Sequence, residues 1–128
     1  MIKRLLLGLL AIGLVLNGLR MLFDPETWYH MLESVPHTGP FNAHFVRDIG
    51  CAYIAAGTGF GLGAWRSAWI VPAGLVALAF LGLHGAVHVW EGFEHTDAAV
   101  HSGAVDLIGV FAPVVLGLVL LIPWRKVS

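Results

Sequence analysis

Charged residues are scarce in this sequence. Only 12% of its 128 residues are charged, 58% are hydrophobic, and the mean hydropathy is +0.81. Average soluble proteins carry about 25% charged residues and about 45–50% apolar ones. A chain of this length cannot bury so much apolar surface inside a single soluble domain. The composition therefore predicts an integral membrane protein that forms one domain over residues 1–128.

Cysteines and basic runs are also nearly absent. Cys51 is the only cysteine, which excludes an internal disulfide, a C-x-x-C motif and a multi-cysteine metal cluster. The net charge is −1 and no basic tract is present, so nucleic acid is not expected as a partner. The sequence H-E-x-x-H does not occur, which excludes the zinc-protease class. The lipid bilayer is left as the first predicted partner.

Long apolar segments fill most of the chain, at about residues 5–23, 45–65, 68–90 and 98–123. Each is close to the roughly 20 residues that a helix needs to cross a bilayer. Helix is the expected structure because lipid cannot form hydrogen bonds with backbone N–H and C=O groups. The first segment is not followed by a signal-peptide cleavage pattern, so we expect it to be an uncleaved span. We predict an all-α, antiparallel four-helix transmembrane bundle. Asp24 and Pro25 predict the start of a short interfacial helix in the first periplasmic loop.

The basic residues predict the orientation of this bundle. If the four segments alternate in direction, one side of the membrane receives Lys3, Arg4, Arg66, Arg125 and Lys126. The positive-inside rule makes that side the cytoplasm, so both termini are predicted inside, with the chain in a bacterial inner membrane. The periplasmic half then receives all seven histidines, at positions 30, 37, 44, 84, 88, 95 and 101.

The stretch "HGAVHVWEGFEH" at 84–95 carries the most informative pattern. His84, His88 and Glu91 are spaced i, i+4 and i+7, which places them on one face of a helix. Two imidazoles and a carboxylate are suitable ligands for a zinc, copper or iron ion, and they can equally carry protons. Haem is not expected, because it would need facing histidines on two helices. The three residues are candidate metal ligands.

Further polar residues lie at a similar depth in the other segments. Charged groups within membrane spans usually face the bundle interior or a wet cavity. We therefore predict a ligand pocket whose supporting residues are Arg20, His44, Arg47, Asp48 and Asp106. The alternative is that these residues form cross-helix ion pairs that only fix the packing of the bundle.

Gly57 and Gly61, within "GTGFGLG", form a small-x-x-x-small pattern that lets helices approach closely. This face predicts contact with a second copy or with a larger membrane complex, or packing within the chain itself. Farther along, Pro113 predicts a kink in the last segment, with Gly109 close by.

Two neighbouring stretches, "FDPETWYHMLESVP" (23–36) and "GPFNAHFVRDIGCAYIAAG" (39–57), carry a family resemblance. Arg47, Gly50, Tyr53 and Gly57 match the pattern R-x-x-G-x-x-Y/L-x-x-x-G. In this the chain resembles the DoxX-like superfamily of small four-span bacterial membrane proteins. The resemblance implies the same fold and location. Some members of that superfamily are linked to thiol or sulfur oxidation, but the single cysteine here does not fit a thiol relay.

Together these features predict a small inner-membrane protein with a periplasm-facing pocket of His, Asp, Glu and Arg side chains. Its leading predicted role is to bind a metal ion or a small polar ligand. One alternative is an accessory or structural subunit of a larger membrane complex. A further alternative is an oxidoreductase-like membrane enzyme acting on a lipid-soluble substrate.

Overall fold

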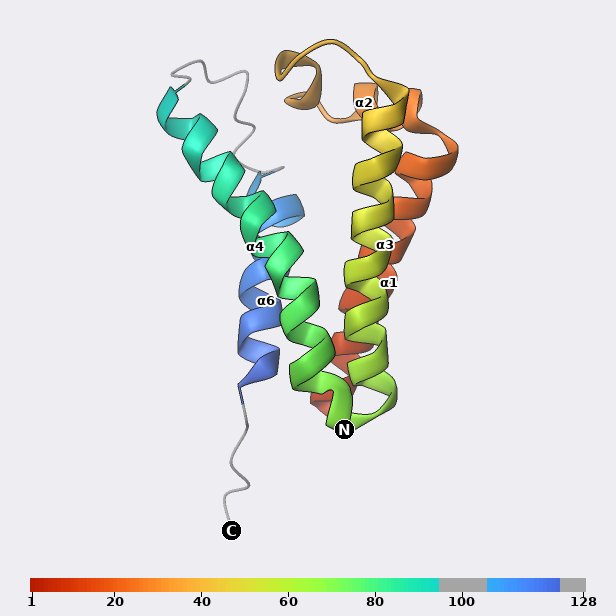
Figure 1. Ribbon diagram of the computed structural model, residues 1–128, viewed down its shortest axis with the longest axis vertical. Helices are drawn as coiled ribbons and strands as arrows, with labels where there is room; N and C mark the ends of the chain where they lie inside the picture. Colours follow the sequence, from red (N-terminus) through yellow and green to blue (C-terminus); the bar gives the residue numbers. More distant parts are fainter. Residues whose placement is uncertain (95–105, 123–128) are drawn as a thin grey trace.

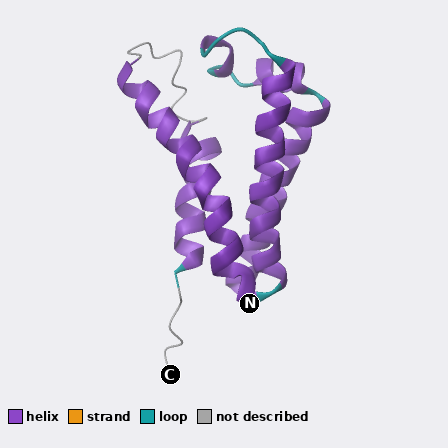
Figure 2. Cartoon of the chain, in the orientation of Figure 1, coloured by secondary structure: helices purple, strands orange, loops and turns teal. Residues whose placement is uncertain are grey.

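The computed structural model describes residues 1–94 and 106–122, and all regular structure in these ranges is helical (Figure 2). The elements are α1 (Ile2–Phe23), α2 (Pro25–Met31), the 3-10 helix η1 (Val35–His37), α3 (Ala43–Trp65), the 3-10 helix η2 (Ser67–Trp69), α4 (Ile70–Glu94), the π-helical η3 (Asp106–Phe111) and α6 (Ala112–Leu121). The predicted all-α class is confirmed. The start of the fourth apolar segment, 98–105, lies outside the described residues.

Helices α1 and α3 form the closest pair, because glycines let their backbones meet (Figure 1). A Cβ at Gly18 would lie 2.5 Å from the carbonyl oxygen of Gly50, and a Cβ at Gly50 would lie 2.8 Å from that of Gly18. A Cβ at Gly57 would lie 2.8 Å from the oxygen of Ala11. The glycines therefore set the distance between the two helices.

Helices α4 and α6 form a second pair, joined to the first through α3 (Figure 1). Phe60 of α3 is fully buried, and together with Leu78 of α4 it occupies the space that a side chain at Gly117 of α6 would need. The buried core follows the same contact and contains Leu7, Ala11, Leu14, Met21, Val46, Tyr53, Ala56, Phe60, Ala77, Leu78, Leu81 and Leu120. The upper part of α4 diverges from α3 in Figure 1.

The N-terminal basic residues donate hydrogen bonds to the C-terminal ends of two other helices. Lys3 Nζ donates to the carbonyl oxygen of Ile122 at 2.8 Å, just after α6. Arg4 donates to the carbonyl oxygens of Ala64 and Trp65, at 2.6 Å each, at the end of α3. Cations at helix C-termini satisfy the last carbonyls and complement the helix dipole. The first-loop helix α2 lies at the opposite end (Figure 1).

Two of the helical stretches, Ile2–Phe23 and Ser67–Phe93, are long and apolar enough to cross a membrane. Helix α3 has the length but not the hydropathy, because it carries Arg47, Asp48 and several glycines. The described part of the last segment, Asp106–Leu121, is a shorter apolar helix.

The irregularity predicted near Pro113 takes the form of a π-helical segment. Proline has no N–H, and its ring clashes with the carbonyl four residues earlier, which here belongs to Gly109. The six residues of η3 directly precede the start of α6, whose second residue is Pro113. A widened turn is a common way to accommodate such a residue.

The α1–α3 contact predicts that alanine substitution destabilises the protein at one glycine of α1 and has little effect at another. Gly18→Ala forces the new Cβ against the backbone of Gly50 and should destabilise the protein by about 1–3 kcal/mol. Gly13→Ala is the matched control, because a Cβ there meets nothing within 4 Å. Thermal unfolding in a mild detergent measures both. Equal melting temperatures for the two variants would contradict this packing.

Candidate functional site

Two cavities lie beside the C-terminal half of α4. The first has a volume of about 330 Å³ and is lined by Met21, Trp28, Tyr29, Val35, Thr38, Gly39, Pro40, Asn42, Phe45, Val46, Ile49, His84, Val87, His88 and Glu91. The second, of about 550 Å³, is lined by Leu9, Leu10, Gly13, Leu14, Asn17, Trp28, Leu32, Val35, Tyr53, His88, Ile108, Gly109, Val110, Pro113 and Leu116. Both volumes fall within the range of about 300–1,000 Å³ typical of small-molecule sites.

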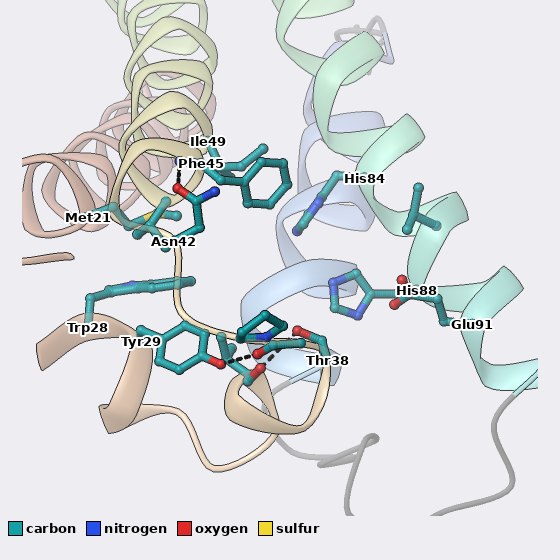
Figure 3. Close-up of a pocket in the computed structure, with 15 residues that line it drawn as sticks. Met21, Trp28, Tyr29, Thr38, Asn42, Phe45, Ile49, His84, His88 and Glu91 are labelled. Atoms are coloured by element: carbon teal, nitrogen blue, oxygen red, sulfur yellow. Dashed lines mark hydrogen bonds between the residues drawn. The ribbon is translucent and has the colours of Figure 1, made fainter. Parts of the chain in front are cut away.

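Helix α4 brings the three predicted metal ligands to one wall of the first cavity. His84, His88 and Glu91 follow each other by one turn, so they share a face of the helix. Figure 3 shows the two imidazoles pointing from α4 toward the loop residues Asn42 and Thr38. The predicted grouping of these three residues on one face is therefore observed.

Aromatic rings hold His84 in place. Its imidazole stacks on Phe80 with ring centroids 5.7 Å apart, and it meets the ring of Tyr53 edge-on at 5.8 Å. On the cavity side it contacts the imidazole of His88 at 4.9 Å. The ring is thus packed against neighbours from both α3 and α4. Its nitrogens make no hydrogen bond to any residue in the described ranges.

His88 forms a polar contact that joins α4 to the last segment. Its Nδ1 lies 3.2 Å from Oδ1 of Asp106, the first residue of η3, and the side chains are only 25% and 12% exposed. A carboxylate can only accept, so Nδ1 donates and Nε2 remains to meet a ligand. A carboxylate partner of this kind orients the ring. His88 lines both cavities and therefore stands where they meet.

Glu91 completes this wall without a partner of its own. Its carboxylate makes no ion pair or hydrogen bond with any other described residue. Nevertheless, residues 1–94 and 106–122 contain no group of three His, Cys, Asp or Glu side chains that could hold a metal ion. The arrangement therefore gives no support to the metal prediction for His84, His88 and Glu91. His95 and His101 lie outside the described residues.

The first loop supplies the opposite wall of the first cavity. Trp28 Nε1 donates to Oδ1 of Asn17 at 2.9 Å, which ties α2 to α1. The hydroxyl of Tyr29 donates to the carbonyl oxygen of Gly39, so the loop folds back over α2 (Figure 3). Sequence analysis did not assign these aromatic residues to the site. The adjacent aromatic residues Trp28 and Tyr29 could have indicated a role in the site, but the same pattern is equally typical of an interfacial membrane anchor.

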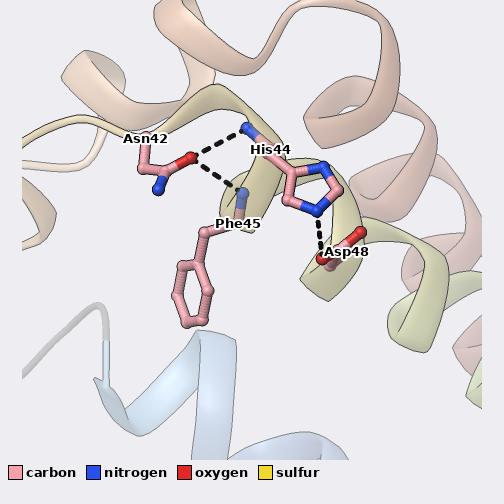
Figure 4. Close-up of polar contacts among 4 residues, drawn as sticks. All are labelled: Asn42, His44, Phe45 and Asp48. Carbon is pink, nitrogen blue, oxygen red and sulfur yellow. Dashed lines mark hydrogen bonds and ion pairs between the residues drawn. The ribbon is translucent and has the colours of Figure 1, made fainter.

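Asn42 ends the loop by capping α3. Its Oδ1 accepts from the backbone N–H groups of His44 and Phe45 at 3.1 and 3.2 Å (Figure 4). Such a cap satisfies two donors that the first turn of a helix leaves without partners. It also fixes the direction in which Phe45 enters the first cavity.

Four of the predicted pocket residues lie elsewhere. Arg20, His44, Arg47 and Asp48 are exposed and line neither cavity. Because α3 buries Val46, Gly50 and Tyr53 against its neighbours, the opposite face of the helix points outward. Of the predicted supporting residues, only Asp106 reaches the cavity wall, through His88.

The four exposed residues each interact with a nearby group instead of with the cavities. Arg20 pairs with Asp24 at 3.2 Å, and His44 pairs with Asp48 at 3.3 Å, as Figure 4 shows. Arg47 Nε donates to the carbonyl oxygen of Leu22 at 3.2 Å, near the end of α1. Of the three pairs formed within the described residues, only that of His88 and Asp106 joins two different helices, and the other two lie within about one turn of chain.

The glycine face of α3 is occupied by the chain itself. A Cβ at Gly57 would lie 2.7 Å from Cγ2 of Val15, and one at Gly61 would lie 3.8 Å from Cβ of Ala11. Of the two roles predicted for this face, packing within the chain is therefore observed. Its contact with a second copy or a larger complex stays a prediction.

Comparison of the chain with protein-family models, with curated proteins and with solved structures finds no match. The resemblance to the DoxX-like superfamily therefore stays a prediction. The chemistry of the cavities follows only from their lining residues and the contacts between them.

The His88–Asp106 pair predicts a coupling that can be compared with a surface pair. A double-mutant cycle with His88→Ala and Asp106→Ala should give an interaction energy of about 1 kcal/mol, since the pair is largely buried. The same cycle at His44 and Asp48 should give a value near zero, because those side chains are 87% and 60% exposed. Thermal unfolding in detergent yields both values. Equal couplings would show that the buried pair has no special role.

Proposed function

We propose that this chain is a four-span inner-membrane protein with both termini in the cytoplasm. We further propose that it binds a small neutral or cationic organic molecule at its periplasmic end. The observation that carries the binding proposal is the wall of His84, His88 and Glu91 facing an aromatic loop across a cavity of about 330 Å³. The site contains few polar groups, set among apolar and aromatic ones, as is typical of ligand sites.

Exposed apolar side chains support the membrane location. Leu5, Ile12 and Leu16 are each 57–62% exposed and lie along one face of α1. Similar side chains cover α4 and α6, among them Leu75, Val76, Leu83, Val115 and Leu118. Soluble monomers rarely expose apolar surface on this scale, whereas a bilayer would cover it.

The polar ends of the bundle support the proposed orientation. Lys3, Arg4 and Arg66 gather at one end, and α2 with His30 lies at the other. Helix α3 is less apolar than a typical span. Its charged groups fall within its first two turns, where long side chains can reach the interface. Arg47 already points its guanidinium back to the end of α1.

The charges of the cavities favour neutral or cationic ligands. Among the described residues that line them, there is no lysine or arginine to receive a carboxylate or phosphate. The formal charge on the lining comes from Glu91, with Asp106 behind His88. An amine or hydroxyl can donate to Glu91 and to Nε2 of His88, whereas an anion would meet two carboxylates with no counter-charge on the wall.

The orientation predicts which loops can be labelled from outside. In a Cys51→Ala background, Thr38→Cys places a thiol in the first loop, and Ser67→Cys places one in the tight link after α3. A membrane-impermeant maleimide should label the Thr38→Cys variant in intact cells and the Ser67→Cys variant only after the membrane is permeabilised. Labelling of both, or the reverse pattern, would contradict the proposed topology.

The charge of the site predicts its preference between two matched probes. Purified protein should bind 2-phenylethylamine more tightly than phenylacetate, because the amine can pair with Glu91. Glu91→Gln should lower the affinity for the amine about tenfold, which corresponds to one charge-assisted hydrogen bond. Isothermal titration in detergent or nanodiscs measures the affinities.

Glu33→Gln is the control for that experiment. Glu33 is an exposed carboxylate of the first loop and lines neither cavity, so its neutralisation should leave amine binding unchanged. Tighter binding of phenylacetate, or equal effects of the two substitutions, would refute the proposed site.

A further inference from the structure

The second cavity is elongated and almost entirely apolar. Along α1 its lining extends from Asn17 to Leu9, a distance of about 12 Å at 1.5 Å per residue. On the other side it follows the last segment from Ile108 to Leu116. Four of its lining side chains carry polar atoms, namely Asn17, Trp28, Tyr53 and His88. The amide of Asn17 is bonded to Trp28 and to the sulfur of Met21.

The two cavities adjoin each other. Trp28, Val35 and His88 contribute to both walls. A molecule whose polar group lies at His88 and Glu91 would have to pass these three shared side chains to place a chain in the apolar cavity between α1 and the last segment. In the proposed bundle this second part lies at the depth of the hydrocarbon, while the first lies at the periplasmic end.

We infer that the ligand of this site is a single-chain amphiphile with an amine or hydroxyl head, which meets His88 and Glu91 while its apolar chain fills the second cavity. This inference rests on the proposed function and adds the chemical class of the ligand to it. The chain would pack against leucine, isoleucine and valine in a cavity as apolar as the bilayer, so it gains van der Waals contacts there at no cost in polar desolvation. The head would meet Nε2 of the neutral His88 imidazole and the carboxylate of Glu91, for which the described residues supply no other partner.

Two glycines allow the chain cavity to be filled without disturbing the fold. Gly13 lines the second cavity, and a Cβ there meets nothing within 4 Å. Gly82 of α4 is equally open but lines neither cavity. Gly13→Leu therefore places a side chain in the proposed chain site, and Gly82→Leu is the matched control on another helix.

The test is the binding of radiolabelled dodecylamine to purified protein in nanodiscs, with the specific part defined by competition with unlabelled dodecylamine. Gly13→Leu should weaken this binding at least about tenfold, because its side chain takes up space that the ligand chain needs and overpacking costs about 1–3 kcal/mol. Gly82→Leu should bind dodecylamine as the wild type does. Gly109→Leu, on the opposite wall of the same cavity and also open at its Cβ, should repeat the loss if Gly13→Leu does not fold.

The short probe 2-phenylethylamine separates the two proposals. It should bind the Gly13→Leu variant and the wild type alike, because it has no chain to place in the second cavity. If it binds and dodecylamine binding is unchanged in Gly13→Leu, the chain inference is overturned while the head site stands. Ordinary bilayer lipid filling the cavity would give that result. If neither amine binds the wild type specifically, the proposed function itself fails.

Discussion

The close approach of α1 and α3 is the contact on which the rest of this structure depends. At Gly18 and Gly50 the two backbones come so near that a single methyl group would collide with a carbonyl oxygen. Because the two helices are close, Tyr53 and Phe60 of α3 belong to the same buried core as the apolar residues of α1. The same closeness lets Arg4 of α1 donate to the last carbonyl groups of α3. Small residues at helix contacts give the close packing on which membrane helices depend, since lipid provides no hydrophobic drive between them.

The second pair of helices leaves room for a site. α4 contacts α3 through its N-terminal half, where Ala73 and Ala77 meet Gly59, and the two helices then diverge. The first loop occupies the space at the wide end, and its tryptophan and tyrosine are tied down by hydrogen bonds. The His88–Asp106 pair joins α4 to the last segment at the same level. The cavity is therefore bounded by Trp28 and Tyr29 on the loop side and by His88 on the helix side, each held by a hydrogen bond or polar contact.

Much of this arrangement was readable from the sequence. The apolar lengths predicted helices over the ranges where α1, α3 and α4 occur, and Pro25 marked the start of α2 correctly. The spacing of His84, His88 and Glu91 predicted a shared face. The pocket prediction was less successful because it grouped residues by depth alone, and depth does not say which side of a helix points inward. His44, Arg47 and Asp48 share the level of the site but lie on the outer face of α3.

The sequence by itself determined the helical class, the apolar character and the concentration of histidines toward one end. These depend on composition and on the periodicity of single helices, which are local properties. Only the tertiary structure decided that Asp106 pairs with His88, that Trp28 lines both cavities, and that Arg20 and Arg47 stay outside them. Such choices depend on the rotation of each helix about its axis, and that rotation is set by contacts between residues far apart in the chain.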